Sequence, residues 1–152
     1  MNKAILKSYF NGNKGKYKDI LFGKCFEESG KYIISDSYSI IVLNDTYGLE
    51  VTKDNIGITR VKENLERDYN YAFKDYTMEN FNEYLSKEID NKILTIKDNY
   101  GINVPLFNKI QKIIKANTYT ILENEQLYEK YVIKLENSKT KEYALLICSI
   151  II

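Results

Sequence analysis

Lysines at helical spacing are the side chains of this sequence best placed to do chemistry. Lys3 and Lys7 lie one turn apart in one segment with helical periodicity, and Lys109, Lys112 and Lys115 lie in a second. An ammonium group is a point charge that binds phosphate oxygens without reading the base sequence. If the two segments form neighbouring helices, the five lysines share a surface that could contact double-stranded DNA. A solvated helix face would explain the same residues.

Acidic and aromatic residues alternate in the middle of the chain, and this combination is typical of protein-binding surfaces. Aromatic rings anchor an interface, whereas carboxylates steer a basic partner towards it. The structural alternative is a half-buried helix whose carboxylates are solvated. The residues expected to contact a protein partner are Glu66, Asp68, Tyr69, Tyr71, Tyr76, Glu79 and Glu83.

Catalytic chemistry is restricted because the chain has no histidine. Without it, the chain cannot by itself form a Ser-His-Asp triad, a Cys-His pair or a His-ligated metal site. Carboxylates holding Mg²⁺ would be the remaining option, but the available ones show no metal-nuclease spacing. The Gly- and Lys-rich loop 11–16 lacks the Gly-Lys-Ser/Thr ending of a phosphate-binding loop. We therefore expect a non-enzymatic protein with no catalytic residue, metal or cofactor. The carboxylates considered are Asp36, Asp45, Glu88 and Asp90.

Composition indicates one globular domain with an uneven charge layout. The 152 residues are 44% hydrophobic and 28% charged, and the net charge is +1; such a chain can bury a core without staples. Residues 1–44 have seven lysines and four acidic residues, and residues 92–152 have nine and six. Residues 45–91 have six basic and eleven acidic residues. Two mildly basic flanks thus enclose an acidic middle.

Cysteine use and hydropathy predict a cytoplasmic protein without membrane association. Cys25 and Cys148 lie in apolar, strand-like segments, which favours reduced and buried thiols. No apolar run approaches the roughly 18 residues that span a membrane. The N-terminal segment lacks the apolar centre of a signal peptide. Ile, Lys, Asn and Tyr, all specified by AT-rich codons, supply 71 of the 152 residues, which favours an AT-rich bacterium or its phage.

Two helices are predicted to position the lysines. The first covers residues 3–11, with apolar residues at helical spacing. The second begins after Asn103 as N-cap, has Pro105 in its first turn and runs to about Ala116, with Asn117 as C-cap. Its predicted buried stripe is Leu106, Phe107, Ile110, Ile113 and Ile114, and its predicted solvent face is Asn108, Lys109, Gln111, Lys112 and Lys115.

Three predicted strands follow each helix, so one order of elements occurs twice. We expect a first unit at 1–44, an acidic insertion at 45–91 and a second unit at 92–152, all within a single domain 1–152. In the insertion, residues 56–61 fit a strand, the stretch around 65–73 fits a strand or a helix, and Thr77 could cap a helix. The strands are predicted at 20–26, 31–35 and 38–43 in the first unit, and at 92–97, before the helix, then 118–122, 128–135 and 142–151 in the second.

The last predicted strand is apolar on both of its alternating faces. A strand with one face in water should alternate between apolar and polar residues. We therefore expect both faces of 142–151 to be buried. The cover could be the insertion, which we favour, or a second copy of the chain pairing with the edge.

A short stretch of the first unit carries a family resemblance. Residues 32–40 read Tyr-Ile-Ile-Ser-Asp-Ser-Tyr-Ser-Ile. This resembles a recurring stretch of bacterial DNA polymerase sliding clamps, in which a short strand leads to Thr-Asp-Gly, a His or Tyr, an Arg and an apolar residue. The residues that match in kind are Ser35, Asp36, Tyr38 and Ile40.

Two positions depart from the clamp pattern, and one later strand agrees with it. Ser37 replaces the Gly and Ser39 replaces the Arg, so a DNA contact of that Arg has no counterpart here. The strand 143–147 resembles the strand that ends such domains. The repeated unit is also similar to the units that pair within each clamp domain.

The resemblance implies an α+β fold in which two pseudo-repeated helix-plus-three-strand units form an antiparallel sheet with two helices on one face. It implies a non-enzymatic, sliding-clamp-like protein acting at DNA or on DNA-handling proteins. A ring around DNA needs many such domains, so the chain would have to assemble copies; we leave its homo-oligomeric state open. The alternative is a monomeric, phage-encoded inhibitor or adaptor that binds a host nuclease or defence complex through the acidic insertion.

Overall fold

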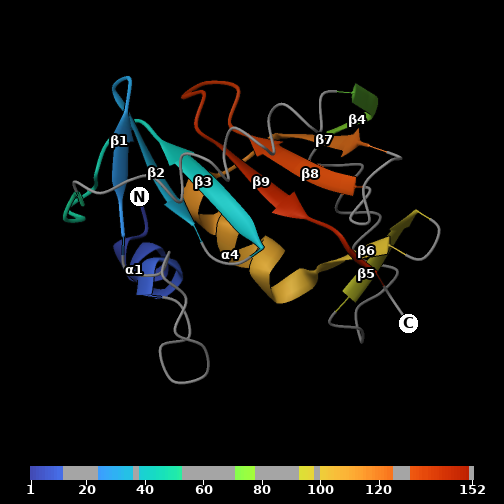
Figure 1. Ribbon diagram of the computed structural model, residues 1–152, viewed down its shortest axis with the longest axis horizontal. Helices are drawn as coiled ribbons and strands as arrows, with labels where there is room; N and C mark the ends of the chain where they lie inside the picture. Colours follow the sequence, from blue (N-terminus) through green and yellow to red (C-terminus); the bar gives the residue numbers. More distant parts are fainter. Residues whose placement is uncertain are drawn as a thin grey trace.

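The computed structural model describes residues 1–11, 24–35, 38–52, 71–77, 93–97, 100–124 and 131–150, of which 71–77, 93–97 and 149–150 are described as backbone (Figure 1). Within these ranges the chain forms an α+β fold. The helices are α1 (Lys3–Asn11) and α4 (Val104–Ile114). The strands are β1 (Phe26–Glu28), β2 (Lys31–Ser35), β3 (Ser39–Leu43), β4 (Tyr71–Thr77), β5 (Ile93–Lys97), β6 (Tyr100–Asn103), β7 (Thr118–Glu123), β8 (Tyr131–Glu136), β9 (Tyr143–Ile147) and β10 (Ser149–Ile150).

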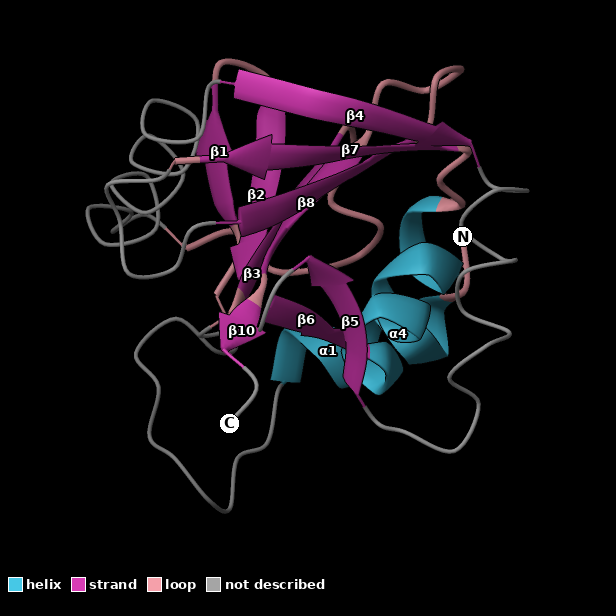
Figure 2. Ribbon diagram, turned by 90° about the vertical axis from the view of Figure 1, so that its right-hand side faces the viewer, coloured by secondary structure: helices cyan, strands magenta, loops and turns pink. Residues whose placement is uncertain are grey.

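A seven-stranded antiparallel sheet is the main structural layer. Its strand order is β1-β2-β3-β9-β8-β7-β4, and a smaller sheet has the order β10-β6-β5. At the centre, β3 pairs with β9 from Ser39 opposite Leu146 to Val42 opposite Tyr143. This pairing joins the two halves of the chain. Figure 2 shows α1 and α4 next to each other, beneath the strands of the main sheet.

The helices cover one face of this sheet and share its larger core. From α1, Leu6 and Tyr9 enter that core, and α4 contributes residues such as Ile110. The strands contribute Ile41 from β3 and Leu146 from β9. These residues are 0–2% exposed, so the apolar stripes of both helices and one face of the central strands are buried in the same core.

The opposite face of the sheet is also apolar and buried. Ile40, Val132 and Leu145 form one cluster there, and a second cluster contains Ile33 and Val42. Neither cluster includes a residue of α1 or α4. The expectation that both faces of the last predicted strand are buried is therefore confirmed for the part that forms β9. Cover by the insertion or by a second copy stays a prediction, because most of 45–91 lies outside the described residues.

Most predicted elements in the described part are confirmed. The helix at 3–11 and the strand at 31–35 have the predicted bounds, and β3, β5 and β7 differ from prediction by one residue. The hairpin between β1 and β2 turns at Ser29 and Gly30, which both have positive φ, as a tight two-residue turn requires. Local signals were strongest in these segments.

Two strand predictions were wrong in their bounds, and one strand was not predicted. Of the strand expected at 20–26, the described residues place only Phe26 in β1, which continues to Glu28, whereas Cys25 makes an isolated parallel bridge to Val51; residues 20–23 lie outside the described part. The last strand does not run unbroken over 142–151. The N–H of Cys148 donates to the carbonyl of Tyr131, and the chain then enters the second sheet as β10. In that sheet β6 was not predicted.

Within the segment predicted as an insertion, residues 71–77 belong to the main sheet. β4 pairs with β7 from Tyr71 opposite Glu123 to Thr77 opposite Thr118. Residues 71–73, which fitted either a strand or a helix, are thus in a strand. Thr77 ends β4, and both the helix expected after it and the strand expected at 56–61 lie outside the described residues.

Burial of both faces makes a direct test of the sheet possible. Leu145 and Leu146 are each 1% exposed and point to opposite faces of β9. Because a lysine placed at either position buries an unpaired charge, Leu145→Lys and Leu146→Lys should each lower the free energy of unfolding by about 3 kcal/mol or more. Urea unfolding measures both. Asn108→Lys, at an exposed position of α4, is the control and should change stability by less than about 0.5 kcal/mol. Free acceptance of lysine at Leu145 would contradict two-sided burial.

Candidate nucleic-acid interface

Helix α1 is held in place at both ends of its buried stripe. The side-chain oxygen of Asn2 accepts a hydrogen bond from the N–H of Ile5 (3.2 Å), as an N-cap does. Further along, the hydroxyl of Tyr9 lies 2.8 Å from the hydroxyl of Ser39 and donates to the Ser39 carbonyl (3.2 Å). The helix is therefore fixed to β3, with Lys3 and Lys7 exposed on its other side.

Helix α4 begins as the sequence predicts. Asn103 has an extended backbone, its side chain accepts from the N–H of Leu106 (3.0 Å), and Pro105 lies in the first turn. Phe107 and Ile110 are buried beneath the helix, whereas Leu106 is only half-buried against the core. The cap and the apolar stripe together fix which side of α4 faces outwards.

The C-terminus of α4 differs from the prediction. Lys115, not Asn117, is the C-cap: it has left-handed geometry (φ 51°, ψ 53°), and its N–H donates to the Gln111 carbonyl (2.8 Å). Gln111 was expected in solvent, but it is half-buried. Its side chain donates to the Ala116 carbonyl (2.9 Å) and accepts from the hydroxyl of Tyr119 (2.6 Å). Basic side chains at this end suit the negative end of the helix dipole.

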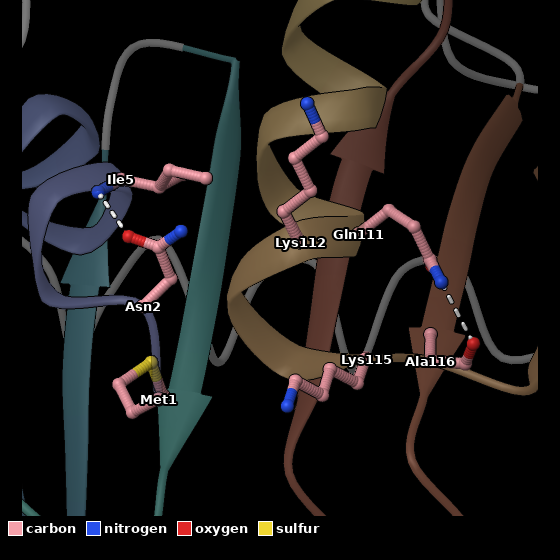
Figure 3. Close-up of a pocket in the computed structure, with 7 residues that line it drawn as sticks. All are labelled: Met1, Asn2, Ile5, Gln111, Lys112, Lys115 and Ala116. Carbon is pink, nitrogen blue, oxygen red and sulfur yellow. Dashed lines mark hydrogen bonds between the residues drawn. The ribbon is translucent and has the colours of Figure 1, made fainter.

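The two helices contact each other, as expected for a shared lysine surface. Between them lies a hollow with a volume of about 670 Å³. In Figure 3, Gln111 turns to Ala116, and Asn2 is engaged with Ile5. The residues that line the hollow are Met1, Asn2, Ile5, Gln111, Lys112, Lys115 and Ala116.

Four of the five predicted lysines are exposed, and one is not. Lys3 and Lys7 on α1, and Lys112 and Lys115 on α4, are exposed. Lys109 is half-buried, so its assignment to the fully solvent-facing side is wrong. Its position one turn before Ile113 brings its stem close to the buried stripe. Within the described part of the chain, no acidic group forms an ion pair with any of the five.

The sequence around both helices contains no acidic residue, a feature that the charge counts over residues 1–44 and 92–152 do not reveal. Residues 1–18 contain no Asp or Glu, and neither do residues 99–122, although the chain has 21 acidic residues in all. A solvated helix face usually mixes charges of both signs. The helix pair therefore presents one sign of charge, with Asn2 and Gln111 as neutral neighbours that spacing alone did not single out.

The predicted protein-binding residues are placed only in part. Tyr71 and Tyr76 lie on β4, opposite Glu123 and Tyr119 of β7. The other five, Glu66, Asp68, Tyr69, Glu79 and Glu83, lie outside the described residues, so their shared surface stays a prediction.

Nucleophilic and metal chemistry find little support in the described residues. Burial raises the pKa of the Cys25 thiol to about 11 and that of Cys148 to about 12, so both stay protonated at neutral pH. Glu142 is buried but accepts from the hydroxyl of Tyr47 (2.7 Å) and the N–H of Asn44 (3.0 Å). In the described ranges, no three acidic or cysteine side chains gather as a metal site would require. None of the described helices has the length and apolar character to cross a membrane.

Comparison of the chain with protein-family models, with curated proteins and with solved structures finds no match.

The buried hydroxyl of Tyr119, which donates to Gln111 of α4, makes the stability of the protein depend on pH. Burial raises the pKa of Tyr119 from 10.0 to about 12. Because the folded-state pKa lies above the unfolded one, the stability that this group contributes is complete below pH 10 and is lost as pH rises from 10 to about 12. Tyr119→Phe should make the decline of the unfolding free energy over that interval shallower. Urea unfolding at several pH values measures the two slopes, and equal slopes would contradict the raised pKa.

Proposed function

We propose that this protein is a non-enzymatic, sliding-clamp-like binding protein that contacts the backbone of double-stranded DNA through α1 and α4. The observation that carries the proposal is the pair of contacting, acid-free helices that expose lysines on one face of a sheet. Phosphates are the ligands that such isolated ammonium groups bind. Contacts of this kind are independent of base sequence and derive their free energy from released counterions.

The strand order supports the clamp-like part of the proposal. Six adjacent strands read β1-β2-β3-β9-β8-β7, so the unit α1-β1-β2-β3 meets the unit α4-β7-β8-β9 at the antiparallel pair of β3 and β9. Each unit is a helix followed by three strands, in mirrored positions about that pair. β4, β5, β6 and β10 have no counterpart in this arrangement.

Two assembly states are compatible with the proposal, because one chain is too small to encircle DNA. A single domain of 152 residues touches a duplex from one side, whereas a ring that encircles DNA requires several copies. Light scattering coupled to gel filtration distinguishes them, because a ring cannot be monomeric. In both forms α1 and α4 face the duplex.

DNA affinity should fall steeply with salt and show little sequence preference. Removing one phosphate-binding ammonium group should make the negative slope of log affinity against log salt shallower by about 0.9 and should lower the affinity at 0.1 M salt by about eightfold. We expect this result for Lys3→Gln, Lys7→Gln, Lys112→Gln and Lys115→Gln, one at a time. Fluorescence anisotropy with a short labelled duplex measures it.

Lys134→Gln is the matched control. Lys134 lies opposite Leu145 in the β8–β9 pairing, on the sheet face away from the helices, with its ammonium 4.8 Å from the centre of the Tyr143 ring. The substitution removes the same charge and should leave DNA affinity unchanged. If DNA affinity fell equally in the control and in the helix variants, the decrease would reflect net charge alone. A wild-type protein that binds no duplex at low salt would contradict DNA binding altogether.

The alternative is a protein inhibitor or adaptor that acts through the acidic segment. It is favoured by the position of β4, which among the described strands pairs only with β7 and so forms an edge of the main sheet. An edge strand can pair with an added strand of a partner. Absence of DNA binding in the experiment above would favour this alternative.

A further inference from the structure

The turn between β8 and β9 is tied to the end of α4. The side-chain amide of Asn137 donates to the carbonyls of Ile114 (3.0 Å) and Lys115 (3.2 Å). These are carbonyls that a helix leaves without an internal partner. The turn therefore begins at the C-terminus of the helix that carries Lys112 and Lys115.

A second link runs between the turn and the residue after the helix. Asn117 donates to the hydroxyl of Ser138 (2.7 Å) and accepts from the Ser138 N–H (2.9 Å). Its own N–H donates to the carbonyl of Glu136 (3.0 Å). Within the turn, the side-chain oxygen of Asn137 accepts from the N–H groups of Lys139 (3.0 Å) and Thr140 (3.2 Å). The backbone of the turn is thus fixed relative to α4.

The tip of the turn has the composition of a phosphate-contacting segment. Ser138, Lys139, Thr140 and Lys141 are all exposed. Lysine, serine and threonine side chains make a large share of protein contacts to DNA phosphates. The acidic residue that follows, Glu142, is 4% exposed and is engaged by Tyr47 and Asn44, so it points away from the tip.

We propose that the β8–β9 turn is a further DNA-contacting element, with Lys139 bound to the phosphate backbone next to the sites of Lys112 and Lys115. The proposal rests on the proposed function. Lys139 is two residues from Asn137, so their α-carbons are at most about 7 Å apart, and Asn137 itself contacts the last turn of α4. The three lysines can therefore meet one duplex at the same time.

Lys139→Gln tests the proposal in the full-length chain. Removal of this ammonium group should make the negative slope of log affinity against log salt shallower by about 0.9 and should lower the affinity for a short labelled duplex at 0.1 M salt by about eightfold. Lys134→Gln, on the strand that leads into the turn but on the sheet face away from the helices, should leave both quantities unchanged. Because Lys139 is exposed, the urea unfolding midpoint of Lys139→Gln should match that of the wild type.

The outcomes separate this proposal from the function on which it rests. If Lys139→Gln binds DNA like the wild type while Lys112→Gln and Lys115→Gln bind more weakly, the turn is not part of the interface and the proposal is overturned. If the affinity of Lys134→Gln falls as much as that of Lys139→Gln, the decrease reflects net charge and the proposal is again overturned. If the wild type binds no duplex even at low salt, the proposed function itself fails.

Discussion

The antiparallel pairing of β3 with β9 is the interaction on which the rest of the structure depends. It joins residues 39–42 to residues 143–146, about a hundred positions later in the chain. Without it, the hairpin strands β1 to β3 and the strands β7 to β9 would be separate small sheets. Because Tyr9 of α1 bonds to Ser39 of β3 and α4 packs on β9, the same pairing brings the two helices together.

Elements set by local signals could be predicted from the sequence. Asn103 and Pro105 define the start of α4 through their own backbone preferences, and Gly30 supports the β1–β2 turn. The apolar stripes of both helices likewise follow from spacing within a few residues. In each case the residues that give the signal lie within a few positions of the element that they define.

Features set by distant partners could not be predicted. Asn117 has the side chain of a good C-cap, yet it bonds to Ser138, 21 positions away, and the helix ends at Lys115 instead. The last strand looks continuous in sequence, but the bond from Cys148 to Tyr131 diverts it into another sheet. In each case a non-local hydrogen bond overrides a local preference.

For the candidate interface, spacing identified the lysines but not their surroundings. It indicated Lys3, Lys7, Lys112 and Lys115, which are exposed, and it misjudged Lys109, which is half-buried. The hydrogen bonds that hold Asn137 against α4 appear only in three dimensions. With a net charge of +1, attraction to DNA would have to come from this segregated face rather than from the whole molecule.

The most direct measurement is an NMR titration of the ¹⁵N-labelled protein with a short duplex at low salt. Our account predicts that amide signals of α1, of the last turn of α4 and of residues 138–141 shift together, while those of the β1–β2 turn stay in place. Shifts confined to β4, or no shifts at all, would contradict it.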